Sequence, residues 1–167
     1  MALHFEGELY RALNPVFARE PLSGEGARLH GGRFNPKGMA ALYLSLSVLT
    51  ALREASQVGS LQPITLVCYQ ADISGIFDGT DADALKAEGM AFDDLSRSGW
   101  RDEMKKQGEA KSQAFARRLI KGGYNGLRVR SFAPGATMAD FNLVLWRWGS
   151  APPARLILVD DEKRLSR

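Results

Sequence analysis

The chain has 167 residues, of which 45% are hydrophobic and 9% aromatic, the size and composition of one domain with its own core. Its 22 Lys and Arg exceed its 19 Asp and Glu by too little for a dedicated nucleic-acid binder, and its single cysteine excludes an internal disulfide and a metal site built on cysteines. It shows neither a secretion signal nor an apolar run of membrane-spanning length. We therefore expect residues 1–167 to form one soluble, cytoplasmic domain, with no metal and no membrane association.

Six short segments have the composition of β-strands, because they are rich in β-branched and aromatic residues and are bounded by Gly, Pro, Asn or Asp. In chain order they are residues 8–13, 41–47, 63–72, 126–131, 141–148 and 154–160. Cys68 lies within the third segment and is expected to be a small core residue rather than a nucleophile.

Helices are predicted between these strands. Ser47 can cap a helix that runs to about Gly59, with Val48, Leu52, Ala55 and Gly59 on one face, and residues 109–123 predict a second helix that ends in two glycines. Residues 74–108 are polar and are expected to hold one or two short helices and a mobile loop. The irregular order of strands and helices predicts an α+β fold, a single compact domain with a mixed or antiparallel β-sheet core and flanking helices.

The segment between the first two strands is rich in glycine and in cations, which is typical of a bendable loop against an anionic ligand. Its motif GGRFNPKG sets Arg33 beside a glycine pair, and a guanidinium can bind a phosphate with two parallel hydrogen bonds. The glycine spacing is neither a Walker loop nor GxGxxG, so spacing alone identifies no nucleotide. A surface turn with a solvated arginine is the alternative.

The next two elements each offer one further candidate. Tyr43 and Ser45 share a polar face of their strand, which is either the floor of a ligand site or an exposed face of an antiparallel sheet. Glu54 follows in the predicted helix, with no cation at ion-pair spacing. Its carboxylate is either solvated at the rim of the domain or directed into a cleft.

The run LYRALNP…LSGEGARLHGGRFNPKGMAALYLSLSVLTALREA, with GYNGLRVRS and FNLVLW later in the chain, resembles the RES domain family of bacterial toxins. The resemblance implies a fold like that of diphtheria-type ADP-ribosyltransferases, NAD+ as co-substrate, and an Xre-like helix-turn-helix antitoxin that blocks the active site. It assigns the family's arginine, aromatic residue, glutamate and serine to Arg33, Tyr43, Glu54 and Ser131.

The resemblance gives these residues distinct roles toward NAD+. Arg33 and the glycine-rich backbone suit the pyrophosphate, and the Tyr43 ring suits the cationic nicotinamide. Glu54 would stabilise the positive charge that grows on the ribose as its bond to nicotinamide breaks. Ser131 and Asn142 would hydrogen-bond to the ribose or the nicotinamide amide, although Asn142 could equally be a satisfied strand residue. We thus expect Glu54, Arg33 and Tyr43 to be catalytic, and Gly32, Arg33, Tyr43, Ser131 and Asn142 to bind NAD+.

The acceptor of the ADP-ribosyl group is left open by these residues. Residues 96–113 are polar and carry Trp100, which we expect to be exposed, and this favours transfer to a docked intracellular protein over breakdown of NAD+ with water or phosphate. A solvated helix and loop is the alternative for this segment. A toxin directed at RNA is a more distant alternative, for which the cations Arg117, Arg118, Lys121, Arg128 and Arg130 would contact a phosphate backbone. Because aromatics are not interleaved with these cations, we expect no direct nucleic-acid binding.

Overall fold

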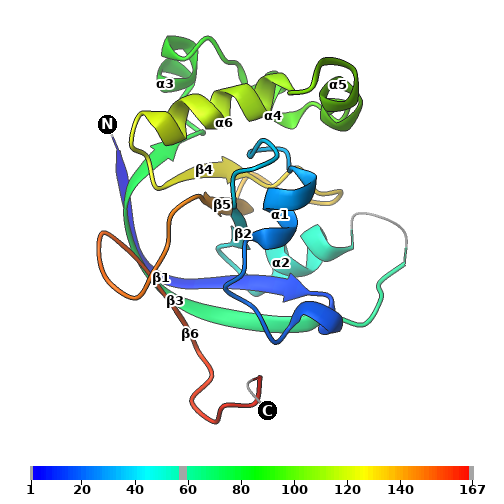
Figure 1. The fold of residues 1–167 in the computed structure, drawn as a ribbon, viewed down its shortest axis with the longest axis vertical. Helices are drawn as coiled ribbons and strands as arrows, with labels where there is room; N and C mark the ends of the chain where they lie inside the picture. The colour runs from blue at the N-terminus through cyan, green and yellow to red at the C-terminus, as the bar shows by residue number, and fades with distance from the viewer. Residues whose placement is uncertain (1, 57–59, 166–167) are drawn as a thin grey trace.

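A computed structural model describes residues 2–56 and 60–165 of the chain (Figure 1). The predicted α+β fold with a mixed sheet is confirmed, and all six predicted strands are present. In chain order the elements are β1 (Leu3–Leu13), the 3-10 helix η1 (Pro15–Phe17), α1 (Glu25–His30), β2 (Leu42–Ser45), α2 (Val48–Ala55), β3 (Thr65–Asp78), α3 (Ala82–Ala87), α4 (Phe92–Ser96), α5 (Trp100–Gln107), α6 (Lys111–Lys121), β4 (Gly126–Arg130), β5 (Phe141–Leu145) and β6 (Ala154–Leu158). Within the two described ranges, no helix combines the length and the apolar character of a membrane span.

The sheet has the strand order β1-β2-β5-β4-β3-β6, and β1 also pairs with β3. Only the β3–β4 pairing is parallel among the described strands, and the others are antiparallel. The long strand β3 serves both halves of the sheet: Tyr69 pairs with β1 and β6, whereas Phe77 pairs with β4. The strand bends between them at Gly75, whose φ of +70° is accessible to glycine at little cost. The sheet therefore folds back on itself.

Strands β2 and β5 lie side by side within the sheet and contribute side chains to two cores. Leu42 and Leu44 of β2 join one hydrophobic core with β1, β3 and β6, while Tyr43 points to the other face and packs against a second core. This second core fills the space between the sheet and helices α3 to α6, which lie together on one side of β4 (Figure 1). Tyr43 is thus covered by other elements and does not lie on an exposed sheet face. Cys68 points away from both cores and is half-buried.

Helix α2 begins as predicted but presents a different face to the domain. The Ser47 hydroxyl caps it by accepting a hydrogen bond from the Thr50 amide at 3.1 Å. The predicted apolar face is wrong, because Val48 and Ala55 are exposed whereas Thr50 and Ala51 are buried. The helix ends at Ala55, and the last predicted residues, 57–59, lie outside the described residues.

Two segments are more ordered than the sequence indicates. The glycine-rich segment contains α1, in which Arg28 pairs with Glu25 one helical turn earlier. The polar segment 74–108 holds three helices rather than one or two, and its first residues continue β3 to Asp78. Asp81 accounts for the first of these helices, because its carboxylate accepts hydrogen bonds from the first amides of α3.

Candidate functional site

A cavity of about 610 Å³ opens between the sheet, α2, α5 and the glycine-rich segment, within the range of small-ligand pockets. Five of the predicted site residues line it, namely Gly32, Arg33, Tyr43, Glu54 and Asn142, and Ser131 contacts Glu54 directly. Residues from β1, α1 and α5 complete the wall, among them Arg11, His30, Trp100, Arg101, Met104 and Lys105. The structure thus brings all six predicted site residues together.

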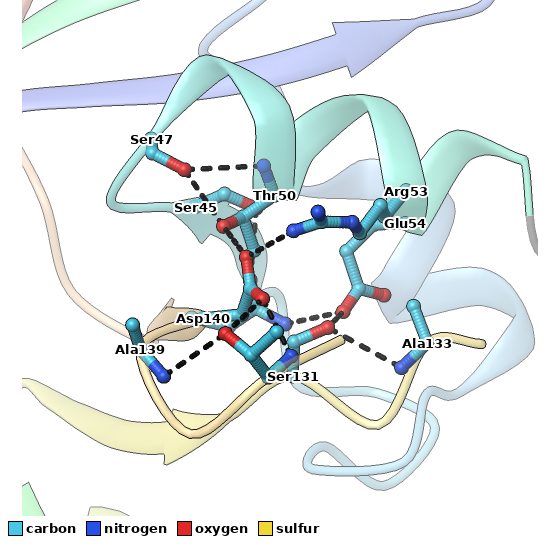
Figure 2. A network of polar contacts seen from close by, with 11 residues as sticks. Ser45, Ser47, Thr50, Arg53, Glu54, Ser131, Ala133, Ala139 and Asp140 are labelled. Carbon is cyan, nitrogen blue, oxygen red and sulfur yellow. Dashed lines mark hydrogen bonds and ion pairs between the residues drawn. The ribbon is translucent and has the colours of Figure 1, made fainter. Parts of the chain in front are cut away.

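Glu54 is held in place by two donors from distant parts of the chain. Its Oε1 accepts a hydrogen bond from the Ser131 hydroxyl (Figure 2) and another from Asn142 Nδ2 at 2.6 Å. Asn142 is itself oriented, because its Oδ1 accepts a hydrogen bond from the Ser45 hydroxyl at 2.8 Å across the β2–β5 pairing. The backbone amide of Ala133 donates to Ser131 Oγ at 3.3 Å. The carboxylate is therefore turned into the cleft, and Asn142 is a member of the site.

A second polar cluster joins α2 to the segment that carries Ser131. One carboxylate oxygen of the buried Asp140 accepts hydrogen bonds from Thr50 Oγ1 at 2.6 Å and Arg53 Nη1 at 2.7 Å, and the other accepts from the Thr137 amide at 2.7 Å (Figure 2). These hydrogen bonds lower the pKa of Asp140 to about 2, and the bond from Thr50 contributes most. Its carbonyl accepts from the Ser131 amide at 2.8 Å. Asp140 escaped the sequence reasoning because its partners lie far away in the chain.

Arg33 is fixed along one edge of its guanidinium. Nη1 donates to the carbonyls of Leu95 at 3.1 Å and Arg97 at 2.7 Å, and the guanidinium carbon lies 5.3 Å from the centre of the Phe132 ring. Nε and Nη2 make no hydrogen bond to any described residue. Burial, and then the charge of Arg101, lower the pKa of Arg33. The side chain thus lines the cavity with a donor edge available for an anion.

Tyr43 contributes its ring to the cavity, while its hydroxyl is used inside the protein. The hydroxyl donates to Asn35 Oδ1 and accepts from the Phe34 amide at 3.1 Å, and burial raises its pKa. Gly32 allows this contact: a Cβ at that position would lie 2.3 Å from the Tyr43 hydroxyl oxygen and 2.5 Å from Asn35 Oδ1. Its amide donates to the Asn35 carbonyl at 3.0 Å. Gly32 therefore shapes the wall by having no side chain.

The backbone of the GGRFN motif is hydrogen-bonded to side chains from elsewhere in the domain. Its carbonyls point into the domain, where Gln113, Ser112 and Trp146 donate hydrogen bonds to them. Gln113 donates to the Gly32 carbonyl at 3.0 Å and to the Asn35 carbonyl at 3.2 Å. Ser112 donates to the Arg33 carbonyl at 2.6 Å, and the Trp146 indole donates to the Phe34 carbonyl at 2.8 Å. Gln113 and Ser112 are buried in α6, and nothing in the local pattern of that helix distinguishes them from solvated polar residues.

Helix α5 supplies a wall of the cavity that the sequence reasoning missed. Trp100, Arg101, Met104 and Lys105 line the cavity, and their spacing is that of one helical face. The expected exposure of Trp100 is wrong: the residue is 7% exposed, because the helix turns its indole inward. A scan for helical spacing within the polar segment could have found this face.

The charges of the cavity are strongly unequal. Among the described residues that line it, Arg11, Arg33, Arg101 and Lys105 are cationic, and Glu54 is the single carboxylate. None of these four cations forms an ion pair with a described residue. Such a surplus of positive charge around one carboxylate suits a ligand with several anionic groups.

The cations considered for nucleic-acid binding are arranged differently. Arg117 pairs with Glu109 at 3.0 Å, Arg118 with Glu88 at 3.9 Å, and Arg128 with Asp78 at 3.0 Å. Neighbouring carboxylates thus offset three of the five charges, whereas Lys121 and Arg130 form no ion pair with a described residue.

The model of the family described as RES domain matches residues 8–167. A comparison with curated proteins finds no match to the chain. The family match spans nearly the whole chain and includes every residue of the site described above. The chain therefore belongs to the RES domain family, which provides the toxin of toxin–antitoxin systems.

Proposed function

We propose that the protein is a toxin that cleaves the bond between nicotinamide and ribose in NAD+ and passes the ADP-ribosyl group to an acceptor. RES domains are associated with the processing of NAD+, which supports the choice of substrate. One observation carries the proposal: a carboxylate, Glu54, held by Ser131 and Asn142 inside a cavity that also presents the donor edge of Arg33.

The reaction needs a positioned negative charge more than it needs an acid. When the bond breaks, its electron pair neutralises the pyridinium nitrogen of nicotinamide, which leaves without taking a proton, and positive charge develops on the ribose. Glu54 stabilises that charge as it grows, as carboxylates do in glycoside hydrolysis. Because its Oε1 is fixed by two donors, the carboxylate does not have to reorganise during the reaction.

The other residues bind the remainder of NAD+. The Nε and Nη2 edge of Arg33 suits the pyrophosphate, and the fixed ring of Tyr43 suits the flat, cationic nicotinamide. The hydroxyl of Tyr43 takes no part, because its donor and acceptor roles are already used.

For the acceptor, the geometry favours a small anion. The burial of Trp100 removes the reason to regard residues 96–113 as a protein-docking edge. The positive charge of the four cavity cations exceeds the negative charge of Glu54 and a doubly charged pyrophosphate together. This surplus supports phosphate, a further anion, as the group that attacks the ribose. A phosphate oxyanion forms the new bond without losing a proton, whereas water or a protein hydroxyl must give one up. Water and a protein side chain are the alternatives.

The test is incubation of the purified protein with NAD+ labelled in its adenylate, with and without phosphate and with and without cell extract. We expect labelled ADP-ribose 1″-phosphate that forms only with phosphate. Free ADP-ribose in all samples would indicate hydrolysis, and label on a protein band would indicate transfer to a protein. Intact NAD+ in every sample, equal to that with Glu54→Gln, would refute the proposal.

We further infer that an Xre-like antitoxin inhibits the protein by covering the mouth of this cavity. Co-purification with such an antitoxin should protect NAD+, and an antitoxin variant that binds without slowing NAD+ loss would contradict the inference.

A further inference from the structure

We propose that Arg101 of α5 is a second phosphate-binding residue of the cavity, and that Arg33 and Arg101 together bind a diphosphate group of the ligand. The inference rests on the proposed function only for the identity of that ligand as a dinucleotide. It assigns a role to the polar segment 96–113 in ligand binding.

Arg101 is exposed at the cavity and stacks on the side chain that precedes it. Its guanidinium carbon lies 4.6 Å from the centre of the Trp100 ring, and that ring is buried. Helix α5 is tied to α6, since Gln113 Nε2 donates to the sulfur of Met104 at 3.1 Å and the Lys111 amide donates to Glu103 Oε1 at 2.9 Å. The same Gln113 holds the backbone of the GGRFN motif. The two arginines are therefore supported by one set of contacts.

Arg101 has no acceptor within the protein. It makes no ion pair and no hydrogen bond with any residue in the described part of the chain. Arg97 pairs with Asp94 at 3.6 Å and with Glu103 at 3.5 Å, whereas Asp102, next to Arg101 in sequence, forms no ion pair with Arg101 in the described part of the chain. The segment thus neutralises Arg97 and leaves the cavity-lining Arg101 without a counter-charge.

Arg33 and Arg101 affect each other across the cavity. The pKa of Arg33 is lowered first by burial and then by the positive charge of Arg101, while the charge of Glu54 acts in the opposite direction. Nε and Nη2 of Arg33 have no partner among the described residues, so both guanidinium groups have donors to spare. A group with two adjacent anionic oxygens bound between them would remove the repulsion and satisfy both sets of donors.

The test is equilibrium binding of ADP-ribose and of adenosine to the full chain by calorimetry. ADP-ribose carries the diphosphate but no nicotinamide bond to cleave, and adenosine carries no phosphate. We expect Arg101→Ala to weaken ADP-ribose binding by about tenfold or more, the effect of losing a charge-assisted hydrogen bond, and to leave adenosine binding unchanged. Arg101→Lys should restore part of the affinity, and NAD+ turnover should show a raised KM with a nearly unchanged kcat.

Lys106→Ala is the matched control, because Lys106 lies on the same helix, is exposed and does not line the cavity. Any of three results would overturn the inference. A folded Arg101→Ala protein could bind ADP-ribose with wild-type affinity, Lys106→Ala could lose as much affinity as Arg101→Ala, or the wild type could fail to bind ADP-ribose. Loss of ADP-ribose binding in Arg101→Ala beside a wild type that never cleaves NAD+ would support the inference and refute the proposed function. If Arg101→Ala cleaves NAD+ with an unchanged KM, the proposed function would be supported and the role of Arg101 refuted.

Discussion

The hydroxyl of Tyr43 and the side chain of Asn35 hold each other at the wall of the cavity. Asn35 is fully buried, accepts the hydrogen bond of the Tyr43 hydroxyl, and donates through Nδ2 to the carbonyls of Ala27 at 2.8 Å and Met39 at 2.9 Å. The tyrosine ring is therefore positioned by the fold before any ligand arrives.

Because the hydroxyl of Tyr43 is bound inside the protein, substitutions can test its role apart from that of the ring. Tyr43→Phe should keep kcat and KM for NAD+ nearly unchanged but lower the free energy of unfolding by about 1–3 kcal/mol, because Asn35 Oδ1 and the Phe34 amide lose a buried partner. Tyr43→Ala should raise KM about tenfold or more through loss of the stacking surface. Denaturant unfolding and NAD+ turnover measure the two effects. A large fall of kcat in Tyr43→Phe would instead assign the hydroxyl a chemical role.

Glu54→Gln should abolish toxicity and lower kcat for NAD+ cleavage at least about a hundredfold, because the growing positive charge on the ribose loses its counter-charge. The amide oxygen can still accept from Ser131 and Asn142, so the unfolding free energy should change by no more than about 1 kcal/mol. Growth assays, NAD+ consumption and thermal unfolding of the purified variant check both parts. Undiminished killing by soluble Glu54→Gln protein would refute the mechanism.

Arg33→Lys should bind NAD+ poorly despite keeping its charge. Lysine replaces the planar fork with a single ammonium group, which cannot both donate to the Leu95 and Arg97 carbonyls and present two donors to a phosphate. We expect KM to rise about tenfold, the cost of one charge-assisted hydrogen bond. Wild-type kinetics in Arg33→Lys would reduce the residue to a general cationic contribution. Lys37→Arg, in the same segment but exposed and outside the cavity lining, is the control.

Asp140 makes the attachment of α2 sensitive to acid. Its pKa is about 2 in the folded chain against an ordinary value of 3.8, so it stabilises the fold above about pH 4, and this stabilisation is lost as the pH falls toward 2. Asp140→Asn should be less stable at neutral pH and should lack this part of the acid dependence. Unfolding midpoints measured from pH 7 to pH 2 for both proteins test this. Parallel curves for the two proteins would show that Asp140 does not couple to folding.

Reversal of charge at Arg117 and Arg118 to glutamate distinguishes an NAD+ site from an RNA site. These arginines lie on α6, pair with Glu109 and Glu88, and do not line the cavity, so NAD+ consumption should be almost unchanged. NAD+ turnover and RNA integrity should be followed in parallel over a range of salt concentrations. Degraded RNA beside intact NAD+, with loss of activity on charge reversal, would favour a nucleic-acid target.

The sequence predicted the parts of this protein that depend on local pattern. Strand-forming composition between Gly, Pro, Asn or Asp residues predicted all six strands, and the Ser47 cap predicted the start of α2. The meeting of Glu54 with Ser131 and Asn142 came from the family resemblance, because contacts between residues that are 77 and 88 positions apart leave no local signal. Asp140 and Gln113 were missed for the same reason, whereas Arg101 was missed although helical spacing within the polar segment could have indicated its face. Trp100 was misjudged because charged neighbours in sequence do not show which face of a helix turns inward.

The position of β2 and β5 between the two cores has a consequence for the response of the protein to its ligand. Tyr43 and Asn142 lie beside residues of β2 and β5 that are buried in the two cores, so we expect their amides to exchange hydrogen with solvent only when the whole domain unfolds. We therefore expect the floor of the cavity to open only together with the rest of the domain. A compound that occupies this floor will therefore raise the melting temperature of the entire domain in proportion to the logarithm of its concentration, which makes thermal shift a direct screen for inhibitors.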